Sequence, residues 1–330
     1  MNNQMPVVDV HSHFTPRAVI EKLQNSPHIF PGINLIDHGQ GRFAFQFPGM
    51  EPSRPATPKL WDVAAAHEWL DAQGIDIHVV GGWADVFGYT LPSDEGASWS
   101  RFMNEATLEE LRGQARFLPL ASVPIQSGAH AVRELEAAHA MGYRGFTIGT
   151  FAPGVDLDHP DLCGLWETAA RLRMPVVLHP FFLYGEPRLA PHDLPNAIGR
   201  LNDTAIAVSR LLYAGALTEY PDLRMIVVHG GGSIPYALGR LARNFELRRD
   251  EVADPRAGFA RLFFDSVVYD PEPLRYLVEL AGADHVLLGS DYPFPIMDPH
   301  PREVVHRANF PQPTADAIMG ANAARLFELG

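Results

Sequence analysis

Four histidines and one aspartate occupy a recurring place in the sequence: each comes at the end of a short apolar run with the length of a β-strand. The first run, VVDV, leads into HSH, which contains His11 and His13. MPVVLHP places His179 after another run, MIVVHGGG places His229, and HVLLGSDYP places Asp291. Because positions i and i+2 of an extended chain point to the same side, His11 and His13 can be aimed at a single point.

These side chains suit a divalent metal ion if the strand ends meet in space. Imidazole nitrogens and carboxylate oxygens are zinc ligands, with Zn–N distances of about 2.0–2.1 Å, and a catalytic zinc keeps one position for water. A lone histidine at a strand end is as well explained by hydrogen-bonded packing. The repetition at several strand ends favours the metal site. The other histidines, among them His67 and His130 on predicted helices, are interpreted as solvated or packed.

The elements that must position these residues alternate along the chain between short apolar runs and segments of helical periodicity. Strands are predicted at 7–10, 75–80, 117–121, 145–148, 176–178, 225–228, 262–264 and 286–288. Helices are predicted at 62–73, 98–112, 129–140, 162–172, 197–217, 234–248, 271–280 and 315–327. Eight such repeats indicate an α/β fold of the closed (β/α)8, or TIM-barrel, type, in which active sites form at the carboxyl ends of the strands.

One segment interrupts this alternation near the N-terminus. Residues 26–60 are rich in proline, glycine and aromatic residues and separate the first predicted strand from the first predicted helix. We interpret them as a small insertion, or lid, over the barrel mouth, with a hairpin near 42–47, where FAFQF alternates apolar and polar positions. No stretch reads as a linker between domains, so residues 1–330 are predicted to form a single domain.

Composition excludes several classes of protein. The net charge of -13 argues against a nucleic-acid partner, because phosphate binding requires a basic surface. No apolar run approaches the roughly 18 residues of a membrane span, which predicts a protein that does not cross a membrane. The single cysteine, Cys163, excludes an internal disulfide, and the first residues do not resemble a secretion signal. These features predict a cytoplasmic protein.

The pattern of an H-x-H after strand one, histidines after strands five and six, and an aspartate after strand eight resembles the amidohydrolase superfamily along the whole chain. The motifs DVHSHFTP, DAQGIDIHVV, FGYT, LHP, HGGGS, GRL and LGSDYPFP more closely resemble the 2-amino-3-carboxymuconate-6-semialdehyde decarboxylases. The resemblance implies that His11, His13, His179 and Asp291 hold one zinc ion. It implies also that His229 is the acid/base beside the metal-bound water, so that His229 and Asp291 are the catalytic pair.

Two details of the sequence refine the metal prediction. A second metal in this superfamily usually requires a lysine or glutamate after strand four, where this chain has GFTIGT. One metal is therefore predicted. The H-x-H separates the chain from related benzoate decarboxylases, in which a glutamate commonly replaces the first histidine and manganese is often preferred. Zinc is the predicted ion, and manganese and cobalt are the alternatives because sequence alone does not select among them.

The resemblance implies decarboxylation of a carboxymuconate semialdehyde, an intermediate of aromatic or tryptophan catabolism. A divalent metal lowers the pKa of its bound water toward about 7 and so supplies hydroxide at neutral pH. Addition of this hydroxide to the unsaturated substrate would create an sp3 carbon from which CO2 can leave, and an imidazole such as that of His229 can carry the proton in both directions. No organic cofactor is required.

A small anionic carboxylate substrate needs cations in an acidic protein. Arg54 and Arg240 match arginines that bind substrate carboxylates in the resembled family, although each could instead form a surface ion pair. If the helix after His229 begins near Ser233, Arg240 lies about 10 Å along it and points away from its own site. This geometry predicts a homodimer in which Arg240 reaches the neighbouring site.

Aromatic residues are predicted to wall the pocket, the candidates being Phe181, Tyr89 and Phe294, with ordinary packing as the alternative for each. Two other functions remain open at this stage. The same site could act as a hydrolase, deaminase or hydratase of a related aminomuconate semialdehyde or keto acid. A non-catalytic metal-binding barrel is the third alternative, and it predicts bound metal without turnover.

Overall fold

The computed structural model describes residues 5–181 and 187–329, and its centre is a ring of parallel strands. These strands are β1 (Val8–His13), β4 (Ile77–Gly81), β5 (Phe117–Pro119), β6 (Ala121–Ser122), β7 (Phe146–Gly149), β10 (Val176–His179), β11 (Met225–Val227), β12 (Phe263–Asp265) and β13 (Val286–Leu287). β5 and β6 flank Leu120 and together occupy one strand position. Each of the eight predicted strands is thus confirmed, with ends that differ by a few residues.

The hydrogen bonds between strands close the ring. One run of neighbours is β1-β4-β5, and the other is β13-β12-β11-β10-β7-β6. Leu120, the residue between β5 and β6, donates from its N–H to the carbonyl of Val80 in β4 at 2.9 Å, so the pairing with β4 continues past the end of β5. The N–H of Val10 donates to the carbonyl of Leu288 at 2.9 Å, and Ser12 bridges Tyr292 in parallel, which joins the last strand to the first. These bonds confirm the (β/α)8 barrel.

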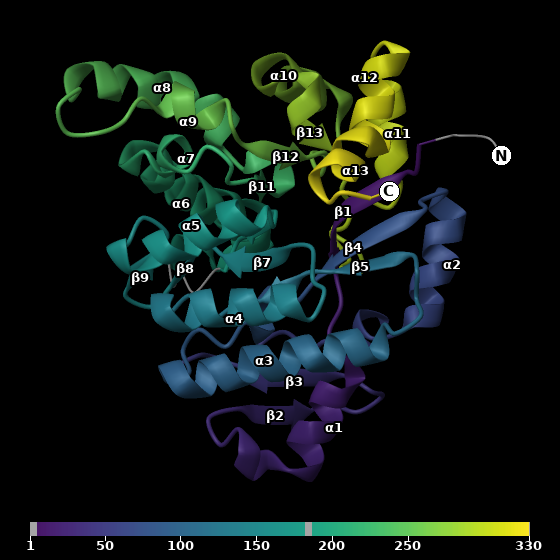
Figure 1. Cartoon of the computed structure of the whole chain (residues 1–330). Coiled ribbons are helices and arrows are strands. Elements are labelled where there is room, and N and C mark those ends of the chain that lie inside the picture. Colours follow the sequence, from purple (N-terminus) through teal and green to yellow (C-terminus); the bar gives the residue numbers. More distant parts are fainter. Residues whose placement is uncertain (1–4, 182–186, 330) are drawn as a thin grey trace.

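Helices surround the strands and connect successive ones (Figure 1). They are α1 (Arg17–Asn25), α2 (Val63–Gln73), α3 (Ser93–Glu110), α4 (Gly128–Ala140), α5 (Cys163–Leu172), α6 (Arg200–Ala214), α7 (Ala216–Glu219), α8 (Ile234–Leu247), α9 (Pro255–Phe259), α10 (Pro271–Ala281), α11 (Pro301–Arg307), α12 (Gln312–Asp316) and α13 (Asn322–Leu326). Wide π-helical turns at Pro195–Gly199 and Ala317–Ala321 precede α6 and α13. Among the described helices, none is both long and apolar enough for a membrane crossing.

The alternation of side chains along the strands places apolar residues inside the barrel and polar residues at the carboxyl ends of the strands. Alternate residues such as Val8, Val10, Val177 and Leu287 form one buried cluster, which also contains Leu326 at the end of α13 and Phe327 just after it. His179 follows Val177 by two positions, so the alternation of the strand turns it inward as well.

His11 does not follow the regular alternation of β1. Strict alternation would place it on the side of Asp9, away from Val8 and Val10, but the pairing of β1 with β4 shifts register between Asp9 and Ser12. The strand was predicted to end at Val10, whereas it continues to His13 with all six residues buried. The predicted strand was too short because hydropathy does not detect polar side chains that are buried with hydrogen-bond partners.

The N-terminal insertion contains a hairpin, and the segment 42–47 where one was predicted holds its second strand. β2 (Asn34–Asp37) pairs antiparallel with β3 (Phe43–Gln46), and the hairpin lies with α1 below α3 in Figure 1. Helix α1 was not predicted. Its buried residues Val19, Ile20 and Leu23 join Phe45, Trp83 and Trp99 in a second apolar cluster. A short hairpin of β8 (Phe151–Ala152) and β9 (Val155–Asp156) follows β7.

Candidate metal and active site

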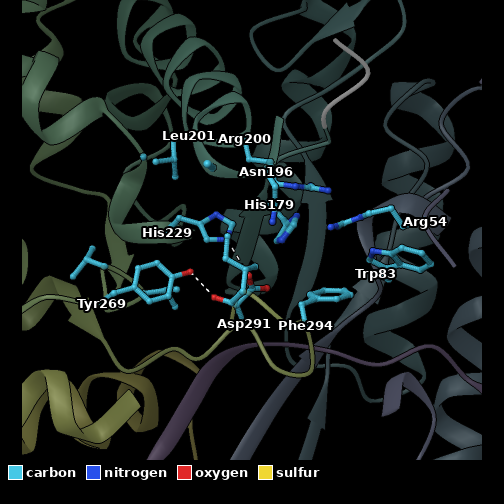
Figure 2. Close-up of a pocket in the computed structure, with 15 residues that line it drawn as sticks. Arg54, Trp83, His179, Asn196, Arg200, Leu201, His229, Tyr269, Asp291 and Phe294 are labelled. Atoms are coloured by element: carbon cyan, nitrogen blue, oxygen red, sulfur yellow. Dashed lines mark hydrogen bonds and ion pairs between the residues drawn. The ribbon is translucent and has the colours of Figure 1, made fainter. Parts of the chain in front are cut away.

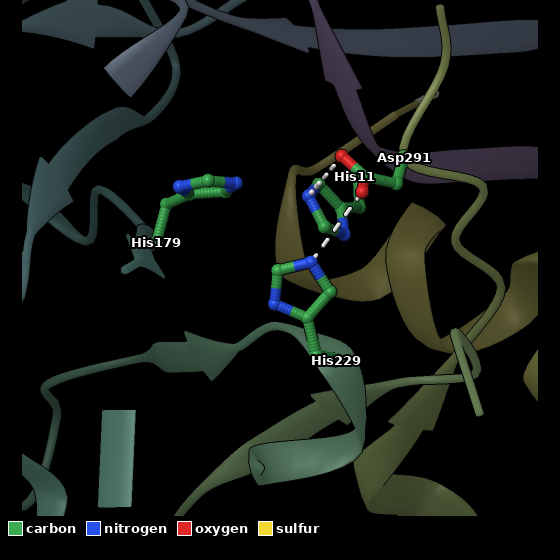
Figure 3. A group of neighbouring side chains, drawn as sticks. All are labelled: His11, His179, His229 and Asp291. Carbon is green, nitrogen blue, oxygen red and sulfur yellow. Dashed lines mark ion pairs between the residues drawn. The ribbon is translucent and has the colours of Figure 1, made fainter. Parts of the chain in front are cut away.

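Four of the predicted side chains gather at the carboxyl ends of β1, β10, β11 and β13. Ligand atoms of His11, His179, His229 and Asp291 all lie within 4.8 Å of one another (Figure 3). His13 lies beside this group, with its Nε2 3.1 Å from Oδ1 of Asp291 and its ring centroid 4.8 Å from that of His179. The structure therefore brings together all five residues whose spacing suggested metal chemistry.

Ring nitrogens of three histidines are held by the scaffold. Nδ1 of His11 lies 2.6 Å from Oδ2 of Asp265, and Nδ1 of His179 donates to the carbonyl of Pro180 at 3.0 Å. Nδ1 of His13 contacts the carbonyl of Gly82 at 3.4 Å. With Nδ1 engaged, each ring presents Nε2 to the centre of the group, which is how outer hydrogen bonds orient metal-binding histidines.

Asp265 was missed by the sequence analysis. It is the last residue of β12, is fully buried, and accepts a hydrogen bond from the N–H of Gly230 at 2.7 Å in addition to its contact with His11. A signal was available, because FFDS places an aspartate at the end of an apolar run, as for the other site residues. Asp265 fixes both a predicted ligand and the turn that carries His229.

The backbone around the site is unusual. His229, Tyr269 and Asp291 have φ values of 56°, 64° and 65°, in the left-handed region that residues other than glycine seldom adopt. Each such residue costs of order 1–3 kcal/mol and persists only where its surroundings enforce it, often at functional sites. The three strained residues all line one cavity.

The charges of the cluster favour a bound cation. Burial lowers the pKa of His11, but the carboxylates of Asp291 and Asp265 outweigh burial and raise it above its ordinary value. Burial raises the pKa of Asp291, yet His11, His13 and His229 hold it well below its usual range. Burial, reinforced by His13 and His11, lowers the pKa of His179 well below 6.5. At neutral pH the cluster therefore offers a neutral imidazole and a charged carboxylate.

This donor set fits a divalent metal ion. Nε2 of His11 and Nδ1 of His229 are buried without a hydrogen-bond partner, although buried polar atoms are normally satisfied. Both belong to residues of the cluster. Imidazole nitrogens combined with one carboxylate match the ligands of zinc and of other first-row transition metals.

A cavity of about 230 Å³ opens beside the cluster (Figure 2). His179, His229 and Asp291 form part of its wall, and of the predicted substrate-binding residues Arg54 and Phe294 also line it. Several other wall residues were not predicted, among them Trp83, Asn196, Arg200 and Tyr269.

The remaining predicted binding residues lie outside this cavity. Phe181 is buried, stacks on Phe87 and contacts Tyr89 edge-on. The hydroxyl of Tyr89 accepts from the N–H of Gly149 at 3.0 Å, and the ring lines a neighbouring outer cavity. Arg240 is exposed on α8. This helix begins at Ile234, next to the start near Ser233 from which the orientation of Arg240 was predicted.

Comparison with known proteins identifies the family. The sequence pattern of the amidohydrolase family matches residues 8–329, so the chain belongs to the amidohydrolases. The 2-amino-3-carboxymuconate-6-semialdehyde decarboxylase of Dictyostelium discoideum is 28% identical over 98% of this chain and 91% of its own length. The resemblance stated from the motifs is thereby confirmed.

Solved structures share the fold. The apo form of the IDCase of Metarhizium anisopliae has a TM-score of 0.84 at 23% identity, covering 99% of this chain and 98% of that one. The dihydroxybenzoic acid decarboxylase of Polaromonas sp. JS666, with bound manganese and the inhibitor 2-nitroresorcinol, has a TM-score of 0.81 at 20% identity over 99% and 98% of the two chains. Both confirm the barrel architecture.

Proposed function

We propose that this protein is a metal-dependent, non-oxidative decarboxylase acting on a carboxymuconate semialdehyde or a closely related unsaturated carboxylate. The observation that carries the proposal is the cluster of His11, His179, His229 and Asp291 on a cavity that also contains an arginine, Arg54. The decarboxylase from Dictyostelium discoideum, similar over nearly the whole chain, supports the choice of reaction.

In this proposal His11, His13, His179 and Asp291 hold a single divalent ion, zinc in the first instance and manganese or cobalt as alternatives. Such an ion acts as a Lewis acid and lowers the pKa of the water it binds. Asp265 supports the arrangement from outside by orienting the ring of His11. No organic cofactor is needed.

His229 is proposed to move the proton. Its Nε2 is 3.5 Å from Oδ2 of Asp291, and its ring forms part of the cavity wall (Figure 2). An imidazole in this position can take a proton from water and return it to the substrate carbon beside the leaving carboxylate. Arg54 binds a substrate carboxylate, and Phe294 covers His13, whose ring centroid is 4.9 Å away.

The test is to incubate purified protein of measured metal content with a panel of amino- and hydroxymuconate semialdehydes, following absorbance, CO2 and ammonia. We expect CO2 release without oxygen or NAD, and we expect His229→Ala to abolish turnover. Ammonia without CO2 would favour the hydrolytic alternative. Bound metal without any turnover would favour the non-catalytic barrel.

We also propose that the protein works in the cytoplasm as a homodimer in which Arg240 reaches the neighbouring site. Arg240 lies exposed on α8, the helix of Tyr236, whose side chain is 89% exposed and contacts the ring of Tyr276. Exposed aromatic residues are enriched at the centres of protein interfaces. This face is the proposed dimer contact.

A further inference from the structure

Arg200 is a second cation in the metal-site cavity. Arg54 comes from the N-terminal insertion and Arg200 from the first turn of α6, and both line the cavity that contains His179 and Asp291 (Figure 2). Both also line the outer cavity of about 1030 Å³ beside it. The two guanidinium groups therefore lie where the inner and outer cavities meet.

Neither arginine forms an ion pair within the part of the chain that the structure describes. Across residues 5–181 and 187–329, the guanidinium of Arg54 makes no hydrogen bond or ion pair. That of Arg200 has a single contact, from Nη1 to the carbonyl of Pro180 at 3.4 Å, and forms no ion pair. Asp203 accepts hydrogen bonds from Thr150 and from the N–H of Phe181, and its carboxylate attracts Arg200 electrostatically without forming an ion pair with it. Two unpaired cations on one cavity repel each other, and a bound anion relieves that repulsion.

A shared backbone carbonyl connects Arg200 to one of the proposed metal ligands. The carbonyl of Pro180 that contacts Arg200 also accepts from Nδ1 of His179. A π-helical turn over Pro195–Gly199 leads into α6, and wide turns of this kind frequently occur at functional sites. Asn196 in this turn and Arg200 at the start of α6 line the same cavity wall.

We propose that Arg200 binds a second carboxylate of the substrate and makes this site selective for planar unsaturated dicarboxylates. Arg54 binds one carboxylate and Arg200 the other, each through the planar fork of a guanidinium. A dicarboxylate is then bound by two arginines of the same protomer, and Arg240 of a neighbour would add to this pair. The inference rests on the proposed function only in taking the ligand to be a carboxylate.

The test compares two unreactive probes by titration calorimetry on the metal-loaded protein: isophthalate, with two carboxylates on one ring, and benzoate, with one. We expect isophthalate to bind more tightly. Arg200→Gln keeps a donor for the Pro180 carbonyl but removes the charge, and should weaken isophthalate roughly 10- to 100-fold while changing benzoate by less than about threefold. Arg200→Met is a second variant without the charge.

The matched control is Arg210→Gln on the same helix, whose side chain pairs with Asp156 and Asp158 at the surface. It should leave the preference for isophthalate unchanged. Metal content and circular dichroism confirm that each variant is folded and loaded. Equal weakening of both probes in both Arg200 variants, or no weakening of either, would overturn the proposal.

The same experiment separates this inference from the proposed reaction. If isophthalate binding depends on Arg200 while none of the semialdehydes releases CO2, the selectivity for dicarboxylates stands and the decarboxylase proposal fails. If CO2 is released and the preference for isophthalate does not depend on Arg200, the inference fails and the reaction stands.

Discussion

His11 connects the two carboxylates of the site. Its Nδ1 contacts Asp265 and its Nε2 lies 3.4 Å from Asp291, so the ring is oriented from behind and aimed at the cluster in front. The two negative charges that raise the pKa of His11 attract a divalent ion for the same electrostatic reason. We therefore expect Asp265 to increase metal affinity although it is not one of the proposed ligands.

Asp265→Asn tests this role. An amide keeps the shape of the side chain but loses the charge that strengthens the hydrogen bond to His11, and such outer contacts are typically worth about 10- to 100-fold in metal affinity. We expect a fall of that size, measured by competition with a chromogenic chelator. The control is Glu134→Gln on α4, a buried carboxylate paired with Arg101. Unchanged metal affinity in Asp265→Asn would contradict the prediction.

The roles proposed for His13 and His229 can be distinguished by metal content. His229 belongs to the compact metal-binding group, and His13 adjoins it through Asp291. If His13 is a ligand and His229 the acid/base, His13→Ala should lose most of its bound metal, whereas His229→Ala should keep it and lose turnover. Elemental analysis of both variants after identical purification checks this. The reverse pattern would exchange the two assignments.

At the scale of elements, the glycine-rich turn after β11 sets the position of α6. Gly232 has φ 62° and ψ -128°, and a Cβ placed there would lie 2.5 Å from the carbonyl oxygen of Leu201. Only glycine allows the turn and the first turn of α6 to approach so closely. The positions of His229 and Arg200 are thereby coupled.

Gly232→Ala should destabilise the glycine-rich turn and displace α6. The left-handed conformation and the contact with Leu201 predict a loss of about 1–3 kcal/mol in the free energy of unfolding, measured with urea. Displacement of α6 should weaken isophthalate binding as well. Gly164→Ala in α5 is the control, because its Cβ would meet Val132 at an ordinary 3.4 Å and helix propensity favours alanine. A Gly232→Ala protein as stable as the wild type would refute the argument.

The barrel could be predicted from the sequence because its strands are short and apolar and its helices are amphipathic. The end of β1 was predicted wrongly because its last residues are buried by contact with a distant polar partner and are not apolar. β1 runs past Val10 because His11 is buried against Asp265, which lies far away in the sequence. Helix α1 was missed although Val19, Ile20 and Leu23 are spaced to bury one face of a helix.

The site was predictable where its residues end apolar runs, and less so where they lie in loops. Tyr269 lies in a loop, and Arg200 lies inside the predicted helix 197–217, but nothing in the sequence shows that either side chain faces the cavity. The aromatic predictions show the same limit. Phe294 lines the cavity, whereas Phe181 packs on Tyr89, because composition does not reveal which side of a loop an aromatic ring occupies.

At the scale of the whole molecule, the predicted ligands come from opposite parts of the ring of strands. β1 and β13 are neighbours, while β10 lies four strand positions from β1 in either direction around the closed ring. An ion that His11, His179 and Asp291 hold together therefore links distant parts of the barrel. Binding to the folded state alone stabilises that state in proportion to affinity.

Metal removal should accordingly destabilise the entire fold. With free metal at about 100 times its dissociation constant, the expected contribution is about 2.7 kcal/mol. We expect dialysis against a chelator to lower the thermal midpoint and readdition of zinc to restore it. His179→Ala, which lacks one proposed ligand, should respond much less to added zinc. A midpoint that is insensitive to both treatments in the wild type would contradict the metal assignment.

The proposed dimer predicts that two inactive variants can restore activity to each other when they share one dimer. If Arg240 serves the neighbouring site, a heterodimer of His229→Ala and Arg240→Ala chains contains one site with native His229 and native Arg240. After complete subunit exchange at equal amounts, half the dimers carry one such site, so activity should recover to about a quarter of the wild type. The control mixture of His229→Ala and His13→Ala should stay inactive, because both residues belong to the same site. Equal inactivity of the two mixtures would show that Arg240 does not act across the interface.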